Sequence, residues 1–469
     1  MFGDILAGIG AFLGQTWWFW VFLILIPVAN DAWLAWRQRK FEHDIKWLFL
    51  EIKIPRETLK SPQAMEQVFM QLFTLKNYAG DLKEIYYDGE ITLWHSFEIA
   101  SLNGEIHFYL LTPKIYRDLT EAAIFAFYPD IELVETEDYL KQYPATVQEL
   151  YRDGMTMYGS EMQLNKSGAY PIRSYVDFES PDENKQYDPI STFLELLAKL
   201  QPGQMAAIQY LTSPVAGPHD KHTIDGYHKE VIRLRERKNE EAENGHGTAN
   251  MSASFPGGIM PALEVAAQDA DPAQVKALRK AVLSRTPGET NIIEAIEDNI
   301  SRPFFNVIIR YIYISKTELY TNHYPRRAMA GMFNQFNGVD INGFTRNKNT
   351  TTRGKYWEWP IVFPHIRYEH RRQKIYYDFR HREVPAHTFF GRILMRATWQ
   401  IKDIESWTFK PRWGSRFMHL NVRSLATLFH LPTYMTLTGP HIKRVDSRKG
   451  GPPAGMAIFG DEGQIDKFK

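Results

Sequence analysis

Residues 91–111 read ITLWHSFEIASLNGEIHFYLL. Apolar and polar residues alternate on both sides of Asn103 and Gly104, and a period of two is typical of β-strands. Asparagine followed by glycine favours a tight turn, because both residues can adopt a positive φ. This stretch therefore predicts a β-hairpin, which is a strong local signal.

A strand and a helix are predicted before this hairpin. Residues 46–54 read KWLFLEIKI and alternate in the same way. Ser61 and Pro62 then provide a helix cap and a proline at the first helical position. Apolar residues recur at helical spacing after them, so a helix should follow the first strand.

A second helix and a short strand are predicted after the hairpin. Thr112 and Pro113 cap a segment with one apolar helical face, which Pro129 ends, and residues 131–135 read IELVE. The resulting order is βαββαβ. That order is typical of a ferredoxin-like module, in which two helices cover one face of a sheet. We assign this module to residues 41–145.

The same pattern restarts between residues 165 and 350, which we interpret as a second ferredoxin-like module. Residues 172–178, IRSYVDF, predict its first strand, and Asp188 with Pro189 caps a helix. The module continues with a strand at 205–212, a strand at 305–314 and a helix at 326–336.

A long insertion interrupts this second module at residues 214–303. It contains a charged helix around residues 229–241 and a Gly/Ser/Ala-rich stretch at 244–258 that is predicted to be disordered. A pair of helices is expected to start at Asp271 and at Pro287.

The N-terminal region contains an apolar segment. Residues 16–36 read TWWFWVFLILIPVANDAWLAW. About 20 helical residues span a bilayer core of roughly 30 Å, so the segment predicts one transmembrane helix within an anchor at residues 1–40. Tryptophans stand at both ends, where aromatic rings meet the water interfaces. They are Trp17, Trp18, Trp20, Trp33 and Trp36.

The charges around this segment predict its orientation. Arg37, Arg39 and Lys40 follow it, and no Lys or Arg precedes it, so the positive-inside rule predicts a cytoplasmic location for the bulk of the chain. A cleaved signal peptide would show a basic start and a small-residue cleavage site, and neither is present. Pro27, Asn30 and Asp31 favour a span shifted toward residues 5–14, and a buried soluble helix is the alternative.

The composition excludes several classes of protein. The 469 residues hold 55 Lys+Arg, 55 Asp+Glu and no cysteine, which excludes disulfides and cysteine-ligated metal sites.

The charge is distributed unevenly, because residues 367–449 contain 17 Lys/Arg against 6 Asp/Glu. We therefore assign residues 351–455 to a basic β-rich region and residues 456–469 to a tail.

No catalytic or cofactor motif is found. Gly354-Lys355 is followed by Tyr356 and does not form a GxxxxGK[ST] phosphate loop. The chain has neither HExxH nor GxSxG, so the sequence predicts no catalytic site, no metal site, no cofactor and no enzyme activity.

The stretch RYEHRRQKIYYDFRHR at residues 367–382 interleaves arginines with aromatic residues, and we expect it to be a strand. Arginines neutralise phosphates and aromatic rings stack on bases, so one interpretation is contact with single-stranded DNA. A packed aromatic face with a solvated arginine face is the commoner arrangement, and docking on acidic lipid headgroups is a third. The candidate contacts are Arg367, Arg371, Arg372, Lys374, Arg380 and Arg382.

Several segments resemble the membrane-anchored region of type IV secretion and conjugation-like DNA-transfer proteins of candidate-phylum bacteria, relatives of TraG/TraD and of HerA/FtsK-type ATPases. The segments are FLEIKIPRE, KSPQAMEQVF, GEIHFYLLTPKIYRDLTEAAIFAFYPD, AYPIRSYVDFE, LATLFHLPT and IKRVDSRKGGPPAG. In those relatives a motor domain follows the proline-rich segment, whereas the sequence here stops at Lys469. Three explanations are open: the motor is a separate polypeptide, the chain is a freestanding paralogue with another role, or the sequence is part of a longer chain. The resemblance implies a ring-shaped homo-oligomer beneath the bacterial inner membrane, and a separate ATPase docked near residues 420–460.

These patterns lead to one expected function and two alternatives. The expected function is a non-enzymatic, single-pass structural or adaptor subunit of a DNA-transfer machine. The first alternative is a membrane-associated scaffold that assembles into a cage or filament without contacting DNA. An unrecognised hydrolase is the second, and it would require a His/Asp cluster formed only by the fold.

Overall fold

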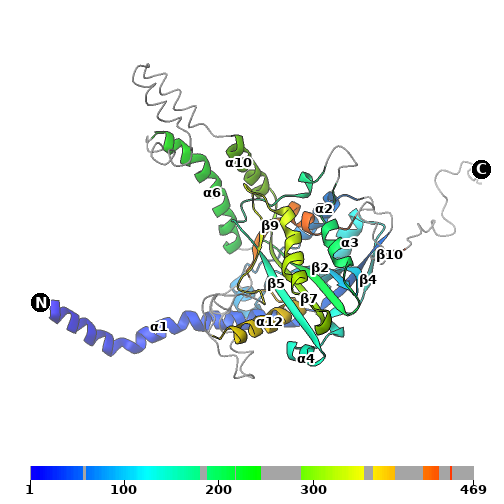
Figure 1. The fold of residues 1–469 in the computed structure, drawn as a ribbon. Helices are drawn as coiled ribbons and strands as arrows, with labels where there is room; N and C mark the ends of the chain where they lie inside the picture. The colour runs from blue at the N-terminus through cyan, green and yellow to red at the C-terminus, as the bar shows by residue number, and fades with distance from the viewer. Residues whose placement is uncertain are drawn as a thin grey trace, which may run out of the picture.

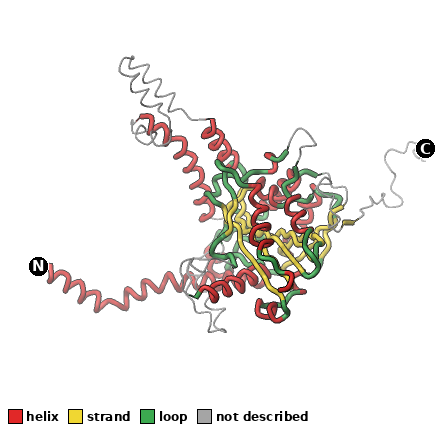
Figure 2. The backbone as a smooth tube through the Cα atoms, in the orientation of Figure 1, coloured by secondary structure: helices red, strands yellow, loops and turns green. Residues whose placement is uncertain are grey.

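The structure, a computed structural model, describes residues 2–55, 60–179, 187–216, 218–243, 287–352, 363–385, 416–432 and 444–445. A large, mainly antiparallel sheet forms its centre, and helices pack on both faces (Figures 1 and 2). This mixed α+β architecture with an N-terminal apolar helix was predicted from the sequence.

The described strands form one ten-stranded sheet in the order β10-β1-β3-β2-β6-β7-β5-β8, with β4 also paired to β1 and β9 to β7. The strands are β1 (Trp47–Pro55), β2 (His95–Leu102), β3 (Glu105–Pro113), β4 (Glu132–Glu135), β5 (Met155–Leu164), β6 (Gln204–Pro214), β7 (Phe304–Lys316), β8 (Phe344–Arg346), β9 (Met418–Asn421) and β10 (Arg444–Val445).

The described helices differ widely in length. The α-helices are α1 (Phe2–Asp44), α2 (Pro62–Phe73), α3 (Arg117–Phe127), α4 (Val147–Arg152), α5 (Ser191–Ala198), α6 (Pro218–Glu243), α10 (Pro287–Ile300), α11 (Met329–Gly331), α12 (Pro364–Arg380) and α14 (Val422–Leu428). Short 3₁₀ or π turns are η1 (Glu84–Asp88), η2 (Lys114–Tyr116), η3 (Tyr139–Gln142), η4 (Tyr175–Asp177), η6 (Thr317–Leu319), η7 (Tyr324–Ala328) and η8 (Met332–Phe336).

The sheet consists of two halves with mirrored strand orders. The first half runs β4-β1-β3-β2, and the second runs β6-β7-β5-β8. Antiparallel pairing of β2 with β6 joins the halves, from His95 opposite Thr212 to Leu102 opposite Met205. Each half thus places its first and third strands side by side in the middle.

The predicted hairpin is confirmed. Asn103 and Gly104 connect β2 to β3 with φ values of 55° and 93°. A Cβ on Gly104 would lie 2.7 Å from the carbonyl oxygen of Leu200, so this glycine is required both by its φ and by the close approach of another chain segment.

Three expectations for the second half and its covering layers are wrong. Residues 172–178 do not form a strand, because Ser174 and Asp177 form a capping box around the single turn η4. The corresponding strand is β5, which begins at Met155, ahead of the predicted module. The helices also cover both faces of the sheet instead of one.

The two faces bury different cores. On one face, α2, α3, α5 and α14 cover a large apolar cluster that includes Phe69, Phe97 and Phe193. On the other face, η3, α4 and α12 cover a smaller cluster that includes Tyr139 and Phe379. Each strand contributes side chains to both clusters, because successive side chains along a β-strand point to opposite faces of the sheet.

The C-terminal region is not β-rich in the residues that the structure describes. The segment 367–382 was expected to be a strand, but Pro364 begins α12 and the chain stays helical to Arg380. The buried residues Tyr368, Tyr376 and Phe379 recur at helical spacing, so the packing of the aromatic residues is that of a helix.

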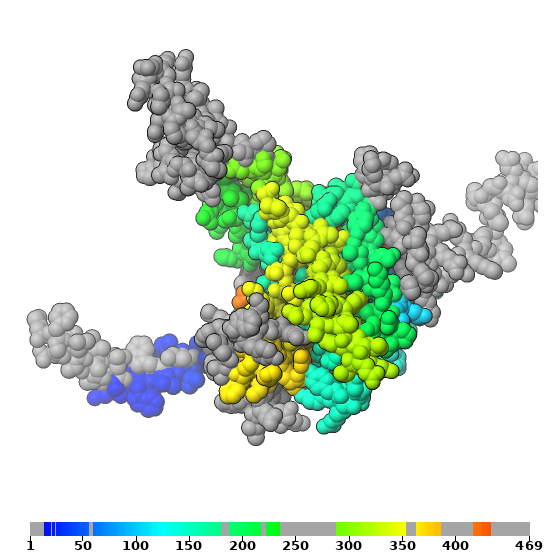
Figure 3. Space-filling view, viewed as in Figure 1, coloured from blue at the N-terminus to red at the C-terminus, as the bar shows by residue number. Residues whose placement is uncertain are grey.

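The insertion forms an arm on the body. Figure 1 shows α6 and α10 standing out from the sheet, and Figure 3 shows their described residues, in green, at one edge of the body. Tyr227 and Val231 of α6 pack with Ile296 of α10. The helices predicted at 229–241 and from Pro287 are confirmed. The predicted disordered stretch at 244–258, the helix from Asp271 and the tail at 456–469 lie outside the described residues.

Candidate functional site at the junction of α1, α12 and the sheet

A row of polar side chains crosses the middle of the sheet. Glu98 of β2 lies opposite Gln209 of β6, Gln209 lies opposite Arg310 of β7, and Arg310 lies opposite Glu161 of β5. All four side chains are buried, and they lie on the face that α12 covers. We call these four residues the polar row.

Glu98 is fully buried and accepts hydrogen bonds from several donors. Ser96 Oγ lies 2.6 Å from Glu98 Oε1, Tyr139 Oη lies 2.8 Å from Oε2, and Gln209 Nε2 lies 3.0 Å from Oε1. A buried carboxylate is costly unless it is paired and hydrogen-bonded, and here both requirements are met. Burial and the charge of Glu98 raise the pKa of Tyr139 well above its usual value.

Arg382 provides the positive charge that Glu98 needs. Its Nε and Nη2 lie 2.9 and 3.1 Å from the two carboxylate oxygens of Glu98, and it also pairs with Asp138. Burial would lower the pKa of this guanidinium, but Glu98 and Asp138 raise it. Arg382 has a φ of 51°, an uncommon value for an arginine, which places its side chain back toward the sheet at the end of α12.

Arg310 connects the other end of the row to α12. Its Nε lies 2.8 Å from Glu161 Oε1, and its Nη1 donates to the carbonyl oxygens of Asp378 at 3.1 Å and Glu383 at 2.7 Å. Gln209 donates to the carbonyl oxygen of Phe379 at 3.2 Å. The last carbonyls of a helix have no partner within the helix and carry partial negative charge, so a guanidinium suits this position.

The same C-terminal loop of α12 also holds α1. Glu383 pairs with Arg39 of α1, and Glu42 lies 2.8 Å from the same arginine. Burial and the neighbouring charge of Glu383 raise the pKa of Glu42 to about 7. Glu383 therefore links the end of α1 to the polar row, because its carbonyl oxygen binds Arg310 while its carboxylate binds Arg39.

A second contact fixes α1 against the turn η1. Trp33 Nε1 donates to the carbonyl oxygen of Tyr86 at 2.8 Å, and the Arg37 guanidinium lies 5.3 Å from the ring centre of Tyr87. Gly89, with a φ of 71°, sits directly against the backbone of Arg37. Arg37 and Arg39, which the charge pattern predicts to lie on the cytoplasmic side, thus contact the folded body. Lys40 is exposed.

The apolar part of α1 extends away from the body (Figure 1). Residues 14–44 form a helix that is long and apolar enough to cross a membrane, as judged by length and composition, and little of it is buried. Trp17, Trp18, Trp33 and Trp36 are exposed, and Trp20 lies in the same helix.

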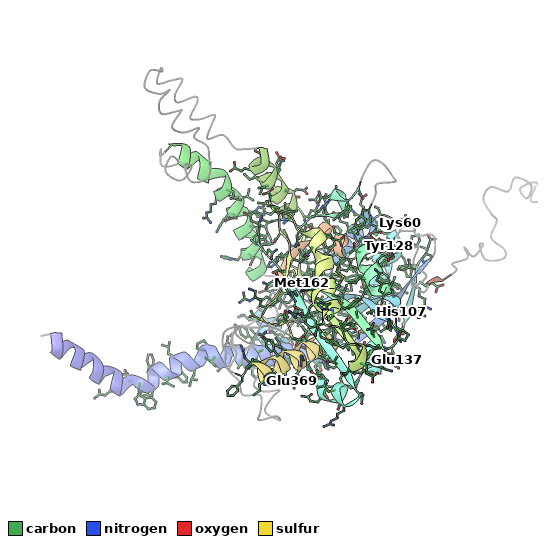
Figure 4. All side chains as sticks on the ribbon, in the orientation of Figure 1. Lys60, His107, Tyr128, Glu137, Met162 and Glu369 are labelled. Atoms are coloured by element: carbon green, nitrogen blue, oxygen red, sulfur yellow. The ribbon has the colours of Figure 1, made fainter. Side chains whose placement is uncertain are left out.

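The candidate contacts at 367–382 lie on or just after α12, and most are engaged within the chain. Figure 4 marks Glu369 on this helix. Arg367 and Arg382 are buried, and Arg380 donates to the carbonyl oxygens of Leu140, Tyr143 and Pro144 at 2.9–3.1 Å. Arg371, Arg372 and Lys374 are half-buried, as is Arg380. Arg371 lies near the carbonyl oxygen of Thr351, Arg372 lies near Tyr151 and Glu369, and Lys374 lies 3.6 Å from Asp378.

The geometry of the polar row is that of a closed structural network. Ser96 and Glu98 are fully buried, so a substrate has no access to this pair in the structure. Within the described part of the chain, no group of three His, Asp or Glu residues could hold a metal ion. The polar row connects β2, β6, β7 and β5 to α12 and, through Glu383, to α1. It can therefore couple the position of these helices to the sheet.

Sequence reasoning missed the polar row. Its signal is a single charged residue inside an otherwise apolar strand, such as Arg310 in FNVIIRYIYI or Glu98 in the first strand of the hairpin. Charged residues are seldom fully buried unless they are paired, so each isolated charge called for a partner on a neighbouring strand.

Together the sheet, the apolar helix and the row define a sheet protein with a docked N-terminal helix. Residues 37–355 match the family described as Domain of unknown function (DUF8128), and the chain belongs to this family. No curated protein matches the chain. The match begins at Arg37, at the docked end of α1, and includes every strand of both mirrored halves.

Proposed function

We propose that the protein is a non-enzymatic structural or adaptor subunit that α1 anchors in a bacterial inner membrane. In this proposal residues 16–36 cross the bilayer, and Arg37, Arg39 and Lys40 keep the sheet on the cytoplasmic side. The observation that carries the proposal is the junction of Arg39 with Glu383 and of Trp33 with Tyr86. A helix docked in this way holds the sheet at a fixed orientation to the membrane.

The two halves of the sheet are proposed to be two ferredoxin-like modules. The observed orders β4-β1-β3-β2 and β6-β7-β5-β8 support this, because a βαββαβ unit places its first and third strands side by side. The second module carries the insertion with α6 and α10 between its second and third strands.

The machine that this subunit serves is proposed to be a type IV secretion or conjugation-like DNA-transfer system. The sequence resemblance supports this class, and with it a homo-oligomer that docks a separate HerA/FtsK-like ATPase and contacts single-stranded DNA. Among the candidate contacts, Arg371, Arg372 and Lys374 are half-buried and not fully buried, and Lys40 next to the proposed span is exposed.

The alternative is a membrane-associated scaffold that assembles into a cage or filament without binding DNA. One observation favours it, namely that Arg380 and Arg382 are engaged by carbonyl oxygens and carboxylates of the same chain. Guanidinium groups held in this way do not reach an external phosphate without losing those contacts.

The anchor is tested with single cysteines, which is direct because the native chain has none. Gln15→Cys and Glu137→Cys place one thiol on each side of the proposed span, and Glu137 is highly exposed. A membrane-impermeant maleimide applied to intact cells should label Gln15→Cys at once and Glu137→Cys only after permeabilisation. Equal labelling of both variants before permeabilisation would contradict the proposed span.

The choice between machine subunit and scaffold is tested on the full chain in detergent. A closed ring that retains single-stranded DNA, with affinity falling steeply as salt rises, supports the DNA-transfer proposal. A cage or filament that is indifferent to DNA supports the scaffold. Lys374→Gln should reduce the salt slope by about one charge if α12 faces DNA, and Arg233→Gln on α6 is the control.

A further inference from the structure

A small pocket lies between η7 and β8, on the second half of the sheet. Its volume is about 130 Å³, and it is lined by Asn322, His323, Arg326, Arg327 and Arg346. Three of these five side chains are guanidinium groups and none is acidic. The pocket is therefore strongly positive.

The guanidinium groups lack counter-charges within the described residues. The ion pairs found there do not include Arg326, Arg327 or Arg346. Arg346 donates to the Tyr158 hydroxyl at 3.2 Å, whereas the Nε of Arg326 is buried without a hydrogen-bond partner. Buried donors are normally satisfied, and like charges held close together repel, so this arrangement points to an anion that accepts from these groups.

The fold, and not a flexible surface, brings these side chains together. Pro325 of η7 is buried, and Met329 and Phe333 just beyond it pack into the large core. Arg346 is held in β8, where it pairs with Met162 of β5. The backbone that carries the arginines is therefore fixed before any ligand arrives, and the Arg346 side chain is also held by the Tyr158 hydroxyl, which lowers the entropy that binding costs.

We propose that this pocket binds a phosphate group, either as inorganic phosphate or as the phosphate of a small phosphomonoester. Guanidinium forks match phosphate oxygens in pairs, and several of them neutralise the two charges of a phosphate dianion. The volume of the pocket limits the size of the ligand. A cavity of about 150 Å³ holds a benzene-sized molecule, and pockets for drug-sized ligands have roughly 300 Å³ or more. The pocket therefore suits a phosphate group and is too small for a whole nucleotide.

The experiment measures phosphate binding by the full chain in detergent. Inorganic phosphate, titrated by calorimetry and followed by the thermal unfolding midpoint, should bind and raise that midpoint, while chloride at equal ionic strength should not. Arg326→Gln and Arg327→Gln should each weaken phosphate binding by 10-fold or more, on the order of the loss of one charge-assisted hydrogen bond. Arg233→Gln on α6 removes the same charge elsewhere and should bind like the native chain.

Two further measurements keep the result unambiguous. Without phosphate, Arg327→Gln should unfold at the same temperature as the native chain or higher, because it breaks no ion pair and relieves repulsion. A lower midpoint would assign the arginines a structural role and overturn the proposal, as would the absence of phosphate binding or equal binding by all variants.

Glycerol phosphate that competes with inorganic phosphate identifies a monoester site, and failure to compete identifies a site for free phosphate.

Discussion

The two halves of the sheet share a strand order but connect their second and third strands differently. In the first half, Asn103 and Gly104 alone join β2 to β3. In the second half, the connection from Pro214 to Phe304 contains α6 and α10. The strand pairing between β6 and β7 is nonetheless the longest in the sheet, running from Gln204 opposite Ser315 to Pro214 opposite Phe305.

This difference shows that the second and third strands of a half pair equally well through a two-residue turn or through a long insertion. Loop closure becomes only slowly more costly as a loop lengthens, so well-matched strands tolerate an insertion. The strands are held in register by the side chains that pack on each face of the sheet and by the polar row. Substitutions in the polar row and at the turns measure how evenly the two halves depend on each.

The largest effect is expected from Arg310→Met in the second half. The change leaves Glu161 buried without its arginine and should lower the free energy of unfolding by about 3–5 kcal/mol. Chemical denaturation of the purified chain measures this. In the first half, Arg382→Met leaves Glu98 with hydrogen bonds from Ser96, Tyr139 and Gln209 but without its counter-charge, and it should lower the free energy of unfolding by a similar amount.

The control for this prediction is the double variant Arg310→Met with Glu161→Leu. Removing both charges leaves no unpaired buried charge, although the carbonyl oxygens of Asp378 and Glu383 still lose the donor of Arg310. The double variant should therefore be more stable than Arg310→Met alone. If the single change left stability intact, the polar row would not join the strands in the way the distances indicate.

The next largest effect is a pH dependence that arises in the first half. Burial lowers the pKa of His95 to about 4. The unfolded chain therefore binds a proton that the folded chain refuses between pH about 6.5 and 4, and stability should fall by up to about 3 kcal/mol as the pH falls through that window. Thr212 lies opposite His95 in the second half and does not titrate.

The variant His95→Gln isolates this effect. The free energy of unfolding of the native chain, measured from pH 7 to pH 4, should decrease more steeply with falling pH than that of the variant, by up to about 3 kcal/mol over this range. Parallel curves would show that the acid sensitivity has another origin.

A smaller effect is expected at the tight turn of the first half. Gly104→Ala introduces a Cβ at a φ of 93° and 2.7 Å from the Leu200 carbonyl oxygen, so it should cost about 1–3 kcal/mol. Gly226→Ala in α6 is the matched change in the arm, where nothing lies within 4 Å of the added atom. That variant should be neutral or more stable, and a reversed ranking in thermal unfolding would refute the comparison.

The smallest effect is expected at the junction with α1. Glu383→Gln removes the ion pair with Arg39, whose side chain is about one third exposed (32%), so the loss should be below about 1 kcal/mol. Hydrogen exchange of the amides at residues 33–44 should nevertheless become faster. Glu137→Gln changes an exposed carboxylate that pairs with Lys141, and it should leave that exchange unchanged.

Much of the first half could be predicted from the sequence. The strands around residues 46–54, 91–102 and 105–111 have clear alternation, and the turn residues fix the hairpin. The second half was harder because β5 reads MTMYGSEMQL, in which Gly159 and Glu161 interrupt the apolar pattern. Those interruptions are explained by tertiary contacts, since Glu161 binds Arg310, and a Cβ at Gly159 would lie 3.0 Å from Ile375 of α12.

The candidate site was predicted less well. The arginines and aromatics at 367–382 alternate closely enough to suggest a strand, but Pro364 and the spacing of Tyr368, Tyr376 and Phe379 indicate a helix. The polar row could not be assembled from sequence, because its register depends on which strands are neighbours. The apolar helix α1, by contrast, could be predicted because its signal depends on local composition alone.

The link between α1 and the sheet is very short. Only Ile45 and Lys46 separate Asp44, the last residue of α1, from Trp47, the first residue of β1, and two residues reach about 7 Å at most. Lys46 is itself held by the sheet, because its carbonyl oxygen accepts from the Lys114 amide at 2.8 Å. In the proposed membrane-bound state, α1 is therefore a lever. A change in its tilt, whether caused by bilayer thickness or by a pulling partner, turns the whole sheet instead of being absorbed by slack in the chain.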